Sequence, residues 1–343
     1  MPSALVCPDK FKGTLSAADA AAAMTAGLQR AGFDTIVSLP LADGGEGTLD
    51  ALLAARGGSR RHATVTGPLG DPVDAEWALL PGGIAVVEMA QASGLALMPR
   101  VRDPLRASTR GTGELIATAI RAGARRVIVG VGGSATTDGG LAAIEALGWS
   151  LGAVPVAVAC DVTTPFLDAA RVFAPQKGAT DAQVALLTRR LASLAVTYEQ
   201  RTGVDVRTLS GAGAAGGLAG GLAAVGAELE AGFDVVANAV GFDDALDGVD
   251  LVVTGEGRLD ATSFAGKVVG GVLEWSADAG VAHVAVIAGQ VTDDATEEVG
   301  VYAGATVLPL TDRVWQSAET YSRAAVLVEE AALEAGRSAL SDA

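Results

Sequence analysis

The chain contains few cysteines, histidines and lysines, and the first two scarcities exclude particular classes of fold and site. Its 343 residues include two cysteines, two histidines and four lysines. Two cysteines cannot build the disulfide framework of a small secreted domain, and both Cys7 and Cys160 lie in apolar runs where buried free thiols are expected. His62 and His283 are far apart in sequence, so neither a histidine-based metal site nor a histidine-based catalytic triad is indicated.

Long apolar runs and an excess of cations are also missing. No uninterrupted apolar span is long enough to cross a membrane and no charged-then-apolar leader is present, so we expect a cytoplasmic protein with no membrane partner. The 24 Lys and Arg residues face 40 Asp and Glu residues, for a net charge of −16, which argues against a nucleic-acid partner. A small anionic substrate remains compatible with this charge, because a site can be locally positive. A monomer and a homodimer are both left open.

The residues that are abundant indicate an α/β protein. Half of the chain is hydrophobic, 45 residues are glycine and aromatic residues are few, while the length allows two domains. Short apolar runs alternate with stretches of helical spacing. We expect strands at residues 4–7, 35–39, 127–129, 154–160, 250–254, 284–288 and 306–310, and helices at residues 17–28, 48–55, 112–122, 141–147, 181–198 and 315–339.

The most informative stretch is RRVIVGVGGSATTDGG, residues 125–140. A bare apolar strand is followed by a glycine loop with hydroxyl side chains, then by a helix. This order presents backbone N–H groups and a helix N-terminus to an anion, usually a phosphate. A phosphate loop with Asp138 beside it is one interpretation. A tight turn in which Asp138 caps the following helix is the other, and the motif alone does not decide between them.

Three expected strand–helix turns end in similar sequences: PDKFKG, ADGGEG and TTDGG. Acidic residues at the carboxyl ends of strands lie where open α/β sheets bind their ligands, so we expect a shared polar crevice. The four lysines, Lys10, Lys12, Lys177 and Lys267, all lie near glycine in an arginine-rich chain. Lysine suits phosphate as a compact point charge, although chance also explains so small a number.

Residues 63–90 alternate short strands with Gly-Pro turns, which predicts an antiparallel meander. We therefore expect a second, mixed α/β domain, inserted in a Rossmann-like parallel-sheet domain, to begin near Val65. The predicted boundaries give residues 1–64, 108–150 and 245–343 to the first domain, and residues 65–107 and 151–244 to the second. Glu88 interrupts an apolar strand of the meander, either facing a cleft or at a solvated edge.

Two glycine patterns resemble a dinucleotide-binding fingerprint. Gly211-x-Gly213-x-x-Gly216 follows a poor strand, so glycines that let a helix pack closely are the preferred interpretation. Gly130-x-Gly132-x-x-Ala135 follows a better strand. A P-loop is excluded, because Val268 follows Gly266-Lys267 where that motif needs Ser or Thr.

Taken together, the motifs resemble those of the bacterial glycerate kinase family. PDKFKGTLSA, ADGGEGT, GVGGSATTDGG, ACDVTTP, FAPQKGA, GAGAAGGL and TGEGRLDATSFAGK occur in the family's order and cover almost the whole chain. The resemblance implies phosphorylation of D-glycerate by ATP with Mg²⁺, giving 2-phosphoglycerate. It also implies a Rossmann-like α/β domain and a second mixed α/β domain, with the active site in the cleft between them.

The resemblance and the needs of phosphoryl transfer suggest roles for particular residues. Asp138 is expected as the base or as a metal ligand, with Asp43 and Asp161 beside it and Asp161 as a second metal ligand. Lys12 and Lys267 are expected on the phosphates. The expected cofactor-binding residues are Gly132, Gly133, Ser134, Gly255 and Gly257, and the expected substrate-binding residues are Asp9, Lys10, Arg258 and Asp260. The chain departs from the family's usual residues at Lys10, Thr137, Thr164 and Thr262, which affects hydrogen bonding to substrate rather than the charged framework.

A kinase for a related small hydroxy acid is the alternative within the same class, and two other function classes stay open at this stage. A dinucleotide-dependent oxidoreductase is supported by the two glycine patterns alone. A sugar-acid-binding regulator would keep the crevice without catalysis, but the acidic charge and the missing helix-turn-helix segment count against it.

Overall fold

A computed structural model describes residues 1–313 and 323–341 and has mixed α/β architecture, as predicted. The chain forms two compact units. Unit 1 consists of Met1–Asp43, Asp50–Ala55 and Val236–Ala343, and unit 2 of Gly44–Leu49 and Arg56–Val235. No helix of the described ranges is long and apolar enough to span a membrane.

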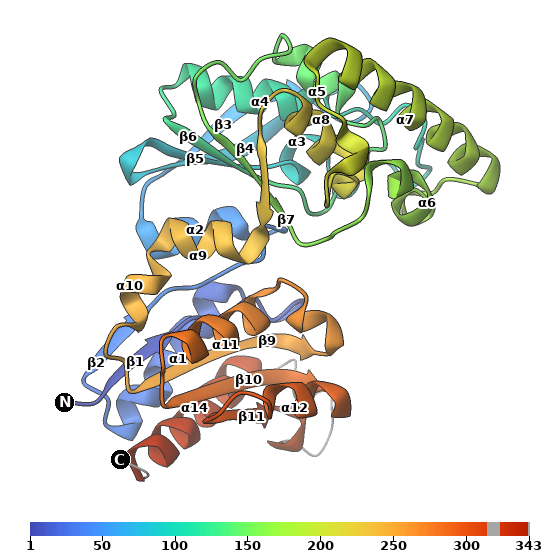
Figure 1. The fold of residues 1–343 in the computed structure, drawn as a ribbon. Helices are drawn as coiled ribbons and strands as arrows, with labels where there is room; N and C mark the ends of the chain where they lie inside the picture. Colours follow the sequence, from blue (N-terminus) through green and yellow to red (C-terminus); the bar gives the residue numbers. More distant parts are fainter. Residues whose placement is uncertain (314–322, 342–343) are drawn as a thin grey trace. The chain divides into compact units, whose positions relative to one another are not determined.

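Unit 1 is built on a sheet of five parallel strands in the order β11-β10-β9-β1-β2 (Figure 1). The strands are β1 (Ser3–Val6), β2 (Thr35–Ser38), β9 (Leu251–Leu259), β10 (His283–Val291) and β11 (Ala305–Pro309). Its helices are α1 (Ala17–Ala31), α10 (Phe242–Leu246), α11 (Val268–Asp278), α12 (Asp293–Val299) and α14 (Ala324–Ser341). Helices α2 (Thr48–Arg56) and α9 (Gly232–Val240) include the points where the chain passes from one unit to the other.

The strand order of unit 1 contains a reversal. From β1 the chain moves to β2 on one side, and the later strands β9, β10 and β11 then add on the other side. The carboxyl ends of β1 and β9 therefore flank the point at which the order changes direction. In open parallel sheets, ligands bind in the crevice at such a point.

Helices α1 and α14 pack closely in the core of unit 1. Met24, Leu28, Leu327 and Val328 are all fully buried there. A side chain at Gly27 would place its Cβ 2.2 Å from the backbone oxygen of Glu329, so only glycine allows this approach. Residues 315–322 of the helix expected at 315–339 lie outside the described residues, and α14 covers residues 324–339 of it.

Unit 2 is built on a six-stranded sheet in the order β3-β4-β5-β6-β7-β8. The strands are β3 (Ser59–Thr66), β4 (Pro72–Leu80), β5 (Ile84–Glu88), β6 (Arg126–Gly130), β7 (Val156–Cys160) and β8 (Glu228–Ala231). The predicted antiparallel meander is confirmed as β3–β5, while β5 to β8 run parallel. The helices are α3 (Ala90–Ser93), α4 (Arg110–Arg121), α5 (Leu141–Ala146), α6 (Ala169–Phe173), α7 (Asp181–Thr202) and α8 (Leu218–Ala224).

The predicted domain boundaries need correction. Residues 108–150 were assigned to the first domain, but β6 pairs with β5 on one side and β7 on the other and so belongs to unit 2. A buried parallel strand has the same apolar pattern in either sheet, so its pairing partners cannot be inferred from the pattern. Residues 44–49 and 56–64, also expected in the first domain, belong to unit 2 as well.

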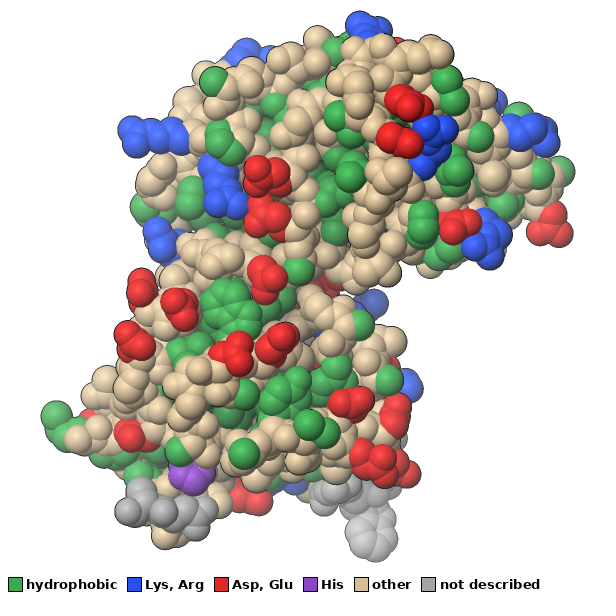
Figure 2. All heavy atoms as spheres, in the orientation of Figure 1, with side chains coloured by type: hydrophobic (Ala, Val, Ile, Leu, Met, Phe, Trp, Pro, Cys, Tyr) green, Lys and Arg blue, Asp and Glu red, His purple; other side chains and the backbone are tan. Residues whose placement is uncertain are grey.

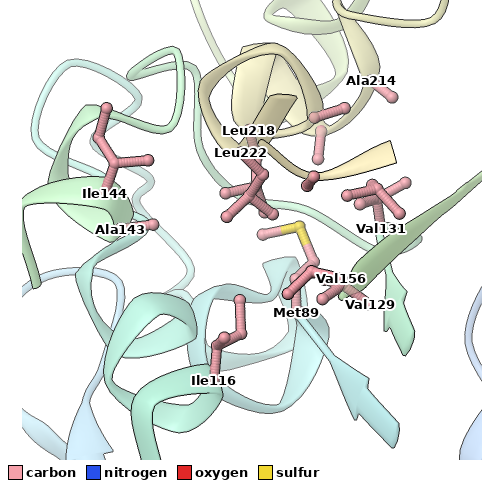
Figure 3. Close-up of a cluster of buried hydrophobic side chains, with 14 of the residues drawn as sticks. Met89, Ile116, Val129, Val131, Ala143, Ile144, Val156, Ala214, Leu218 and Leu222 are labelled. Atoms are coloured by element: carbon pink, nitrogen blue, oxygen red, sulfur yellow. The ribbon is translucent and has the colours of Figure 1, made fainter. Parts of the chain in front are cut away.

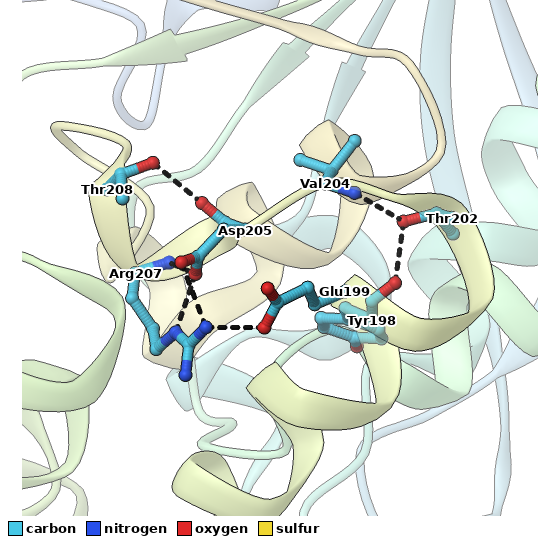
Figure 4. A network of polar contacts seen from close by, with 7 residues as sticks. All are labelled: Tyr198, Glu199, Thr202, Val204, Asp205, Arg207 and Thr208. Atoms are coloured by element: carbon cyan, nitrogen blue, oxygen red, sulfur yellow. Dashed lines mark hydrogen bonds and ion pairs between the residues drawn. The ribbon is translucent and has the colours of Figure 1, made fainter.

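The core of unit 2 lies between the sheet and its covering helices. Figure 3 shows Met89, Val129, Ile116, Ile144 and Leu218 gathered there, all essentially without solvent contact. The C-terminal end of α7 is fixed by polar contacts, in which Arg207 pairs with both Glu199 and Asp205 (Figure 4).

Close packing of α4 on α5 provides a test of the fold. The Cβ of Gly113→Ala would lie 2.2 Å from the backbone oxygen of Ala143, so the two helices must separate. We expect a loss of about 1–3 kcal/mol in the free energy of unfolding, measured by denaturant titration. Gly300→Ala, at an exposed helix end with negative φ, is the control and should be nearly neutral. Equal stabilities of the two variants would contradict the packing described here.

Candidate active site

Polar and charged side chains gather at the carboxyl ends of β1 and β9, where the strand order of unit 1 reverses. The loop after β1 contains Asp9, Lys10 and Lys12. The last residues of the longer strand β9 include Glu256 and Arg258. The sequence predicted a strand only as far as residue 254. The structure continues β9 to Leu259, because β10 pairs with it along its whole length.

The loop after β1 lies directly on β9. The backbone N–H of Asp9 donates to the oxygen of Gly255 at 2.9 Å, extending the parallel pairing beyond the strand. A Cβ at Gly257 would lie 2.9 Å from the backbone nitrogen of Lys12, so glycine is needed there. The loop is closed by reciprocal backbone hydrogen bonds between Phe11 and Leu15, with the Phe11 ring buried beneath.

Two carboxyl groups of this cluster have raised pKa values. Burial, and secondarily the nearby charge of Asp43, raises the pKa of Asp9 to about 6, although the Lys10 N–H donates to Asp9 Oδ1 at 2.7 Å. Burial also raises the pKa of Glu256 to about 7. Glu256 Oε1 is buried and has no hydrogen-bond partner within residues 1–313 and 323–341. Such an orphaned oxygen is costly, so it needs a functional explanation.

Cations and capping residues surround the two acids. Lys267 lies at the N-terminus of α11, and its Nζ donates to Thr262 Oγ1 at 3.0 Å. Asp260 caps the short helical turn at Ala261–Phe264 by accepting from the Thr262 N–H. Arg258 is exposed and pairs with Asp260 at 3.3 Å, a surface contact of low energetic weight.

A cavity of about 230 Å³ opens beside the cluster. Its walls include Lys12, Arg258 and Gln290, so both a cation-rich side and an amide face the space. The nine predicted site residues of unit 1 are thus on or next to one edge of the sheet: Asp9, Lys10, Lys12, Asp43, Gly255, Gly257, Arg258, Asp260 and Lys267.

The donor set suits a hard divalent cation only in part. Carboxylate oxygens are what Mg²⁺ prefers, and Mg²⁺ commonly uses one or two of them together with water and substrate phosphates. Within the described ranges, no three His, Cys, Asp or Glu side chains are arranged to hold a metal by themselves. The site therefore fits a cation shared with a phosphate substrate better than a cation held by protein alone.

The predicted phosphate loop of unit 2 is a close-packed turn. A Cβ at Gly132 would lie 2.8 Å from the Cα of Gly45, and one at Gly130 would lie 2.8 Å from the oxygen of Gly44. Gly133 and Ser134 are tied to the segment after α3 through a backbone bond to Leu95 and a bridge to Gly94. Packing accounts for these glycines, and a phosphate role for the loop stays a prediction.

Asp138 is held by hydrogen bonds that organise unit 2. Its carboxylate accepts from the Thr109 N–H and hydroxyl, both at 2.8 Å, and from the Gly140 N–H at 3.1 Å. It thereby fixes the start of α4 as well as its own turn, and burial raises its pKa. The sequence offered Asp138 as a cap of the helix that follows it, α5. In the structure its carboxylate instead binds Thr109 at the start of α4. Asp161, the other expected metal ligand, is exposed after β7.

Lys177 differs from the other three lysines. Its side chain is buried, and Nζ donates to the backbone oxygen of Thr136 at 2.6 Å. Burial lowers the pKa of Lys177 to about 7, against the opposing attraction of Asp138. This lysine is therefore a core residue that braces the segment before Asp138. A phosphate role stays a prediction for Lys12 and Lys267 and does not extend to Lys177.

The glycines at 211–216 are explained by packing, as preferred from the sequence. A Cβ at Gly213 would lie 2.4 Å from the oxygen of Pro165, and one at Gly216 would lie 2.0 Å from the oxygen of Thr136. The segment before them is a short helical turn, Val206–Thr208, instead of the strand that a dinucleotide fingerprint requires.

Sequence reasoning misjudged Glu88 and overlooked Glu256. Glu88 Oε1 accepts from the Gly47 and Leu49 N–H groups, so this buried residue fixes the turn at 44–49 and lies neither in a cleft nor at a solvated edge. Glu256 was passed over between two glycines, although its place directly after an apolar strand was a usable signal. Both cysteines are free; Cys7 is buried and Cys160 partly buried.

Comparisons with known proteins agree on one family. The model of the glycerate kinase family matches residues 4–153 and 150–339. Glycerate 2-kinase of Escherichia coli K12 is 42% identical over 335 residues, which cover 84% of this chain and 86% of that protein. Glycerate kinase of Bacillus subtilis is 40% identical, and the match covers 94% of this chain and 95% of that protein. A crystal structure assigned as glycerate kinase 2 of Salmonella typhimurium LT2 aligns with a TM-score of 0.85 at 33% identity over 99% of both chains.

Burial of Glu256 predicts a pH-dependent contribution to stability. Its pKa is about 7 when folded and near 4.5 when unfolded, so between these values the folded state binds more protons and the free energy of unfolding falls as pH rises. The contribution lost by pH 8 is at most about 3 kcal/mol. Glu256→Gln should therefore gain stability relative to the wild type between pH 5 and pH 8, as measured by denaturant titration.

The exposed Glu297 on α12 supplies the control, because solvent surrounds its carboxylate. Glu297→Gln should leave the pH dependence of stability unchanged. A wild-type-like pH dependence of Glu256→Gln as well would mean that Glu256 is not buried as described.

Proposed function

Because the chain belongs to the glycerate kinase family, whose members are phosphotransferases with an alcohol group as acceptor, we propose that it phosphorylates D-glycerate from ATP. The product we propose is 2-phosphoglycerate, and the reaction requires Mg²⁺. The observation that carries the proposal is the cluster of carboxylates and lysines at the point where the strand order of unit 1 reverses.

Glu256 is the general base of this proposal. The acceptor oxygen of glycerate forms a bond to the γ-phosphorus, the bond from that phosphorus to the ADP oxygen breaks, and the hydroxyl proton passes to the Glu256 carboxylate. Its buried Oε1, which no residue of the described part of the chain hydrogen-bonds, is the oxygen available to take a proton. Ser263 bonds the same side chain and orients it.

Asp9 and Asp43 would hold Mg²⁺ in this arrangement. Their charges interact, which raises the pKa of Asp9 and makes a shared cation favourable. Mg²⁺ bound there supplies positive charge to the transferring phosphates. The backbone N–H of Asp9 bonds the oxygen of Gly255, which positions this residue beside β9.

Lys12 and Lys267 contribute charge toward the phosphates. Lys267 lies at the N-terminus of an eleven-residue helix, where backbone N–H groups add to the attraction for anions. Lys12 and Arg258 both line the small cavity. We assign Arg258 as the group that binds the glycerate carboxylate. Binding the carboxylate would require Arg258 to leave its exposed pair with Asp260, at little cost.

Two substitutions separate this assignment from one centred on Asp138. Glu256→Gln removes the base and keeps the shape, so kcat should fall at least ~10²-fold with folding intact. Asp138→Asn should chiefly lower stability, because it disturbs the bonds to Thr109 and Gly140. Steady-state kinetics with ATP and D-glycerate, together with denaturant titration, measures both effects. A large kcat loss in Asp138→Asn at unchanged stability, with Glu256→Gln near normal, would transfer the role of base to Asp138.

Lys267 offers a second kinetic test. Lys267→Arg retains the charge but changes its shape and reach at the start of α11, so we expect a clear loss in kcat/KM for ATP. Arg100→Lys, at an exposed position of unit 2, is the matched control and should be silent. Equal, small effects of both changes would show that Lys267 does not contact the phosphates.

The function itself is tested by phosphorus NMR of the wild-type enzyme. Incubation with ATP, Mg²⁺ and D-glycerate should give ADP and the 2-phosphoglycerate resonance. Appearance of 3-phosphoglycerate would keep the kinase and correct the acceptor hydroxyl, whereas no phosphoglycerate would refute the proposal.

A further inference from the structure

Unit 2 contains a cavity of about 650 Å³ that the proposed reaction does not use. Its lining residues come from α5, α7 and the segment that leads into α4. Its size falls within the range of small-molecule sites in proteins. The cavity lies wholly within unit 2, whereas the proposed reacting groups all belong to unit 1.

The wall of the cavity is largely aliphatic. Leu187, Leu191 and Leu194 approach from one face of α7, while Leu105 and Leu141 contribute from the other elements. Leu187 and Leu191 are buried, so the apolar surface continues into the core. Aliphatic side chains of this kind favour contact with the hydrocarbon part of a ligand over contact with a strongly hydrated group.

Three arginines line the same cavity. Arg190 reaches from α7 to the preceding segment, donating from Nη1 to the oxygen of Leu105 at 3.2 Å. Arg106 and Arg189 are exposed, and neither guanidinium group makes a hydrogen bond or an ion pair with any residue of the described ranges. Two guanidinium groups that no described residue pairs, at the edge of an apolar cavity, can bind a planar anion.

The acids of the cavity set the charge that a ligand should carry. Asp138 borders the cavity but is engaged by Thr109 and Gly140, and Glu145 on α5 is exposed. These two negative charges offset two of the three arginines. A polyanion such as a triphosphate would be repelled by the acids, whereas a single carboxylate would be accepted.

We propose that this cavity binds a monoanionic amphiphile, a carboxylate with a hydrocarbon body, through Arg106 and Arg189. The carboxylate lies between the two guanidinium groups, and the hydrocarbon packs on the leucines of α7. The site is independent of the phosphotransferase chemistry proposed above. Its ligand would contact the turn that contains Asp138, the residue to which the start of α4 is hydrogen-bonded.

The test uses 8-anilinonaphthalene-1-sulfonate, a fluorescent monoanion with an apolar body, and the full-length protein. We expect one saturable site, from which octanoate displaces the probe. Arg106→Gln with Arg189→Gln should raise the Kd at least ~10-fold, because both anion-binding groups are removed. Arg100→Gln with Arg125→Gln removes the same charge from exposed positions outside the cavity and should leave the Kd unchanged.

A cavity-filling variant makes the test independent of charge. Ala142→Phe places a ring in the cavity from α5 and should abolish probe binding while the melting temperature is retained. Equal affinity in the paired glutamine variants and in Ala142→Phe would overturn the proposal. So would displacement of the probe by ATP with Mg²⁺ and not by octanoate, since that would make the cavity a nucleotide site.

Discussion

The candidate site depends on the parallel pairing of β1 with β9. These strands are about 250 positions apart in sequence, yet their register places Val6 beside Val253 and continues through the bond from the Asp9 N–H to Gly255. Everything that converges at this edge follows from that pairing. The loop after β1 can lie on β9 only because Gly257 has no side chain. A shift of the register by one residue would turn Glu256 to the opposite face of the sheet.

Pairing of the strands also sets the electrostatics of the site. Bringing two strand ends together buries Asp9 and Glu256, and burial is the largest cause of the rise in both pKa values. The protein therefore spends stability to keep carboxyl groups in a poorly solvated place. Lys267 offsets part of the cost by its charge without pairing directly, as its ammonium bonds Thr262. A phosphate substrate and its cation would supply the interactions that these buried carboxyl groups lack in the protein alone.

Local sequence patterns predicted most elements but not their assembly. The strand and loop at 4–13 and the meander at 63–90 were predicted correctly, because turn residues and apolar alternation are local signals. The sheet to which β6 belongs was predicted wrongly, since pairing depends on contacts far along the chain. Glu88 and Glu256 show the same limit for single residues. The environment of a glutamate after an apolar strand is ambiguous until its neighbours are known. Here Glu88 fixes a turn, while Glu256 has an oxygen that no described residue hydrogen-bonds.

Hydrogen-bond satisfaction distinguishes the two candidates for the general base, Asp138 and Glu256. Asp138 accepts three hydrogen bonds from Thr109 and Gly140, so its carboxylate is already used and its removal would disturb the start of α4. Glu256 has an oxygen that no described residue satisfies. A group that the fold has saturated is a poor acceptor for a substrate proton, because accepting it would break structural bonds. The unsatisfied acid is therefore the better candidate for the base, even though the glycine-rich motif around Asp138 is the more conspicuous feature of the sequence.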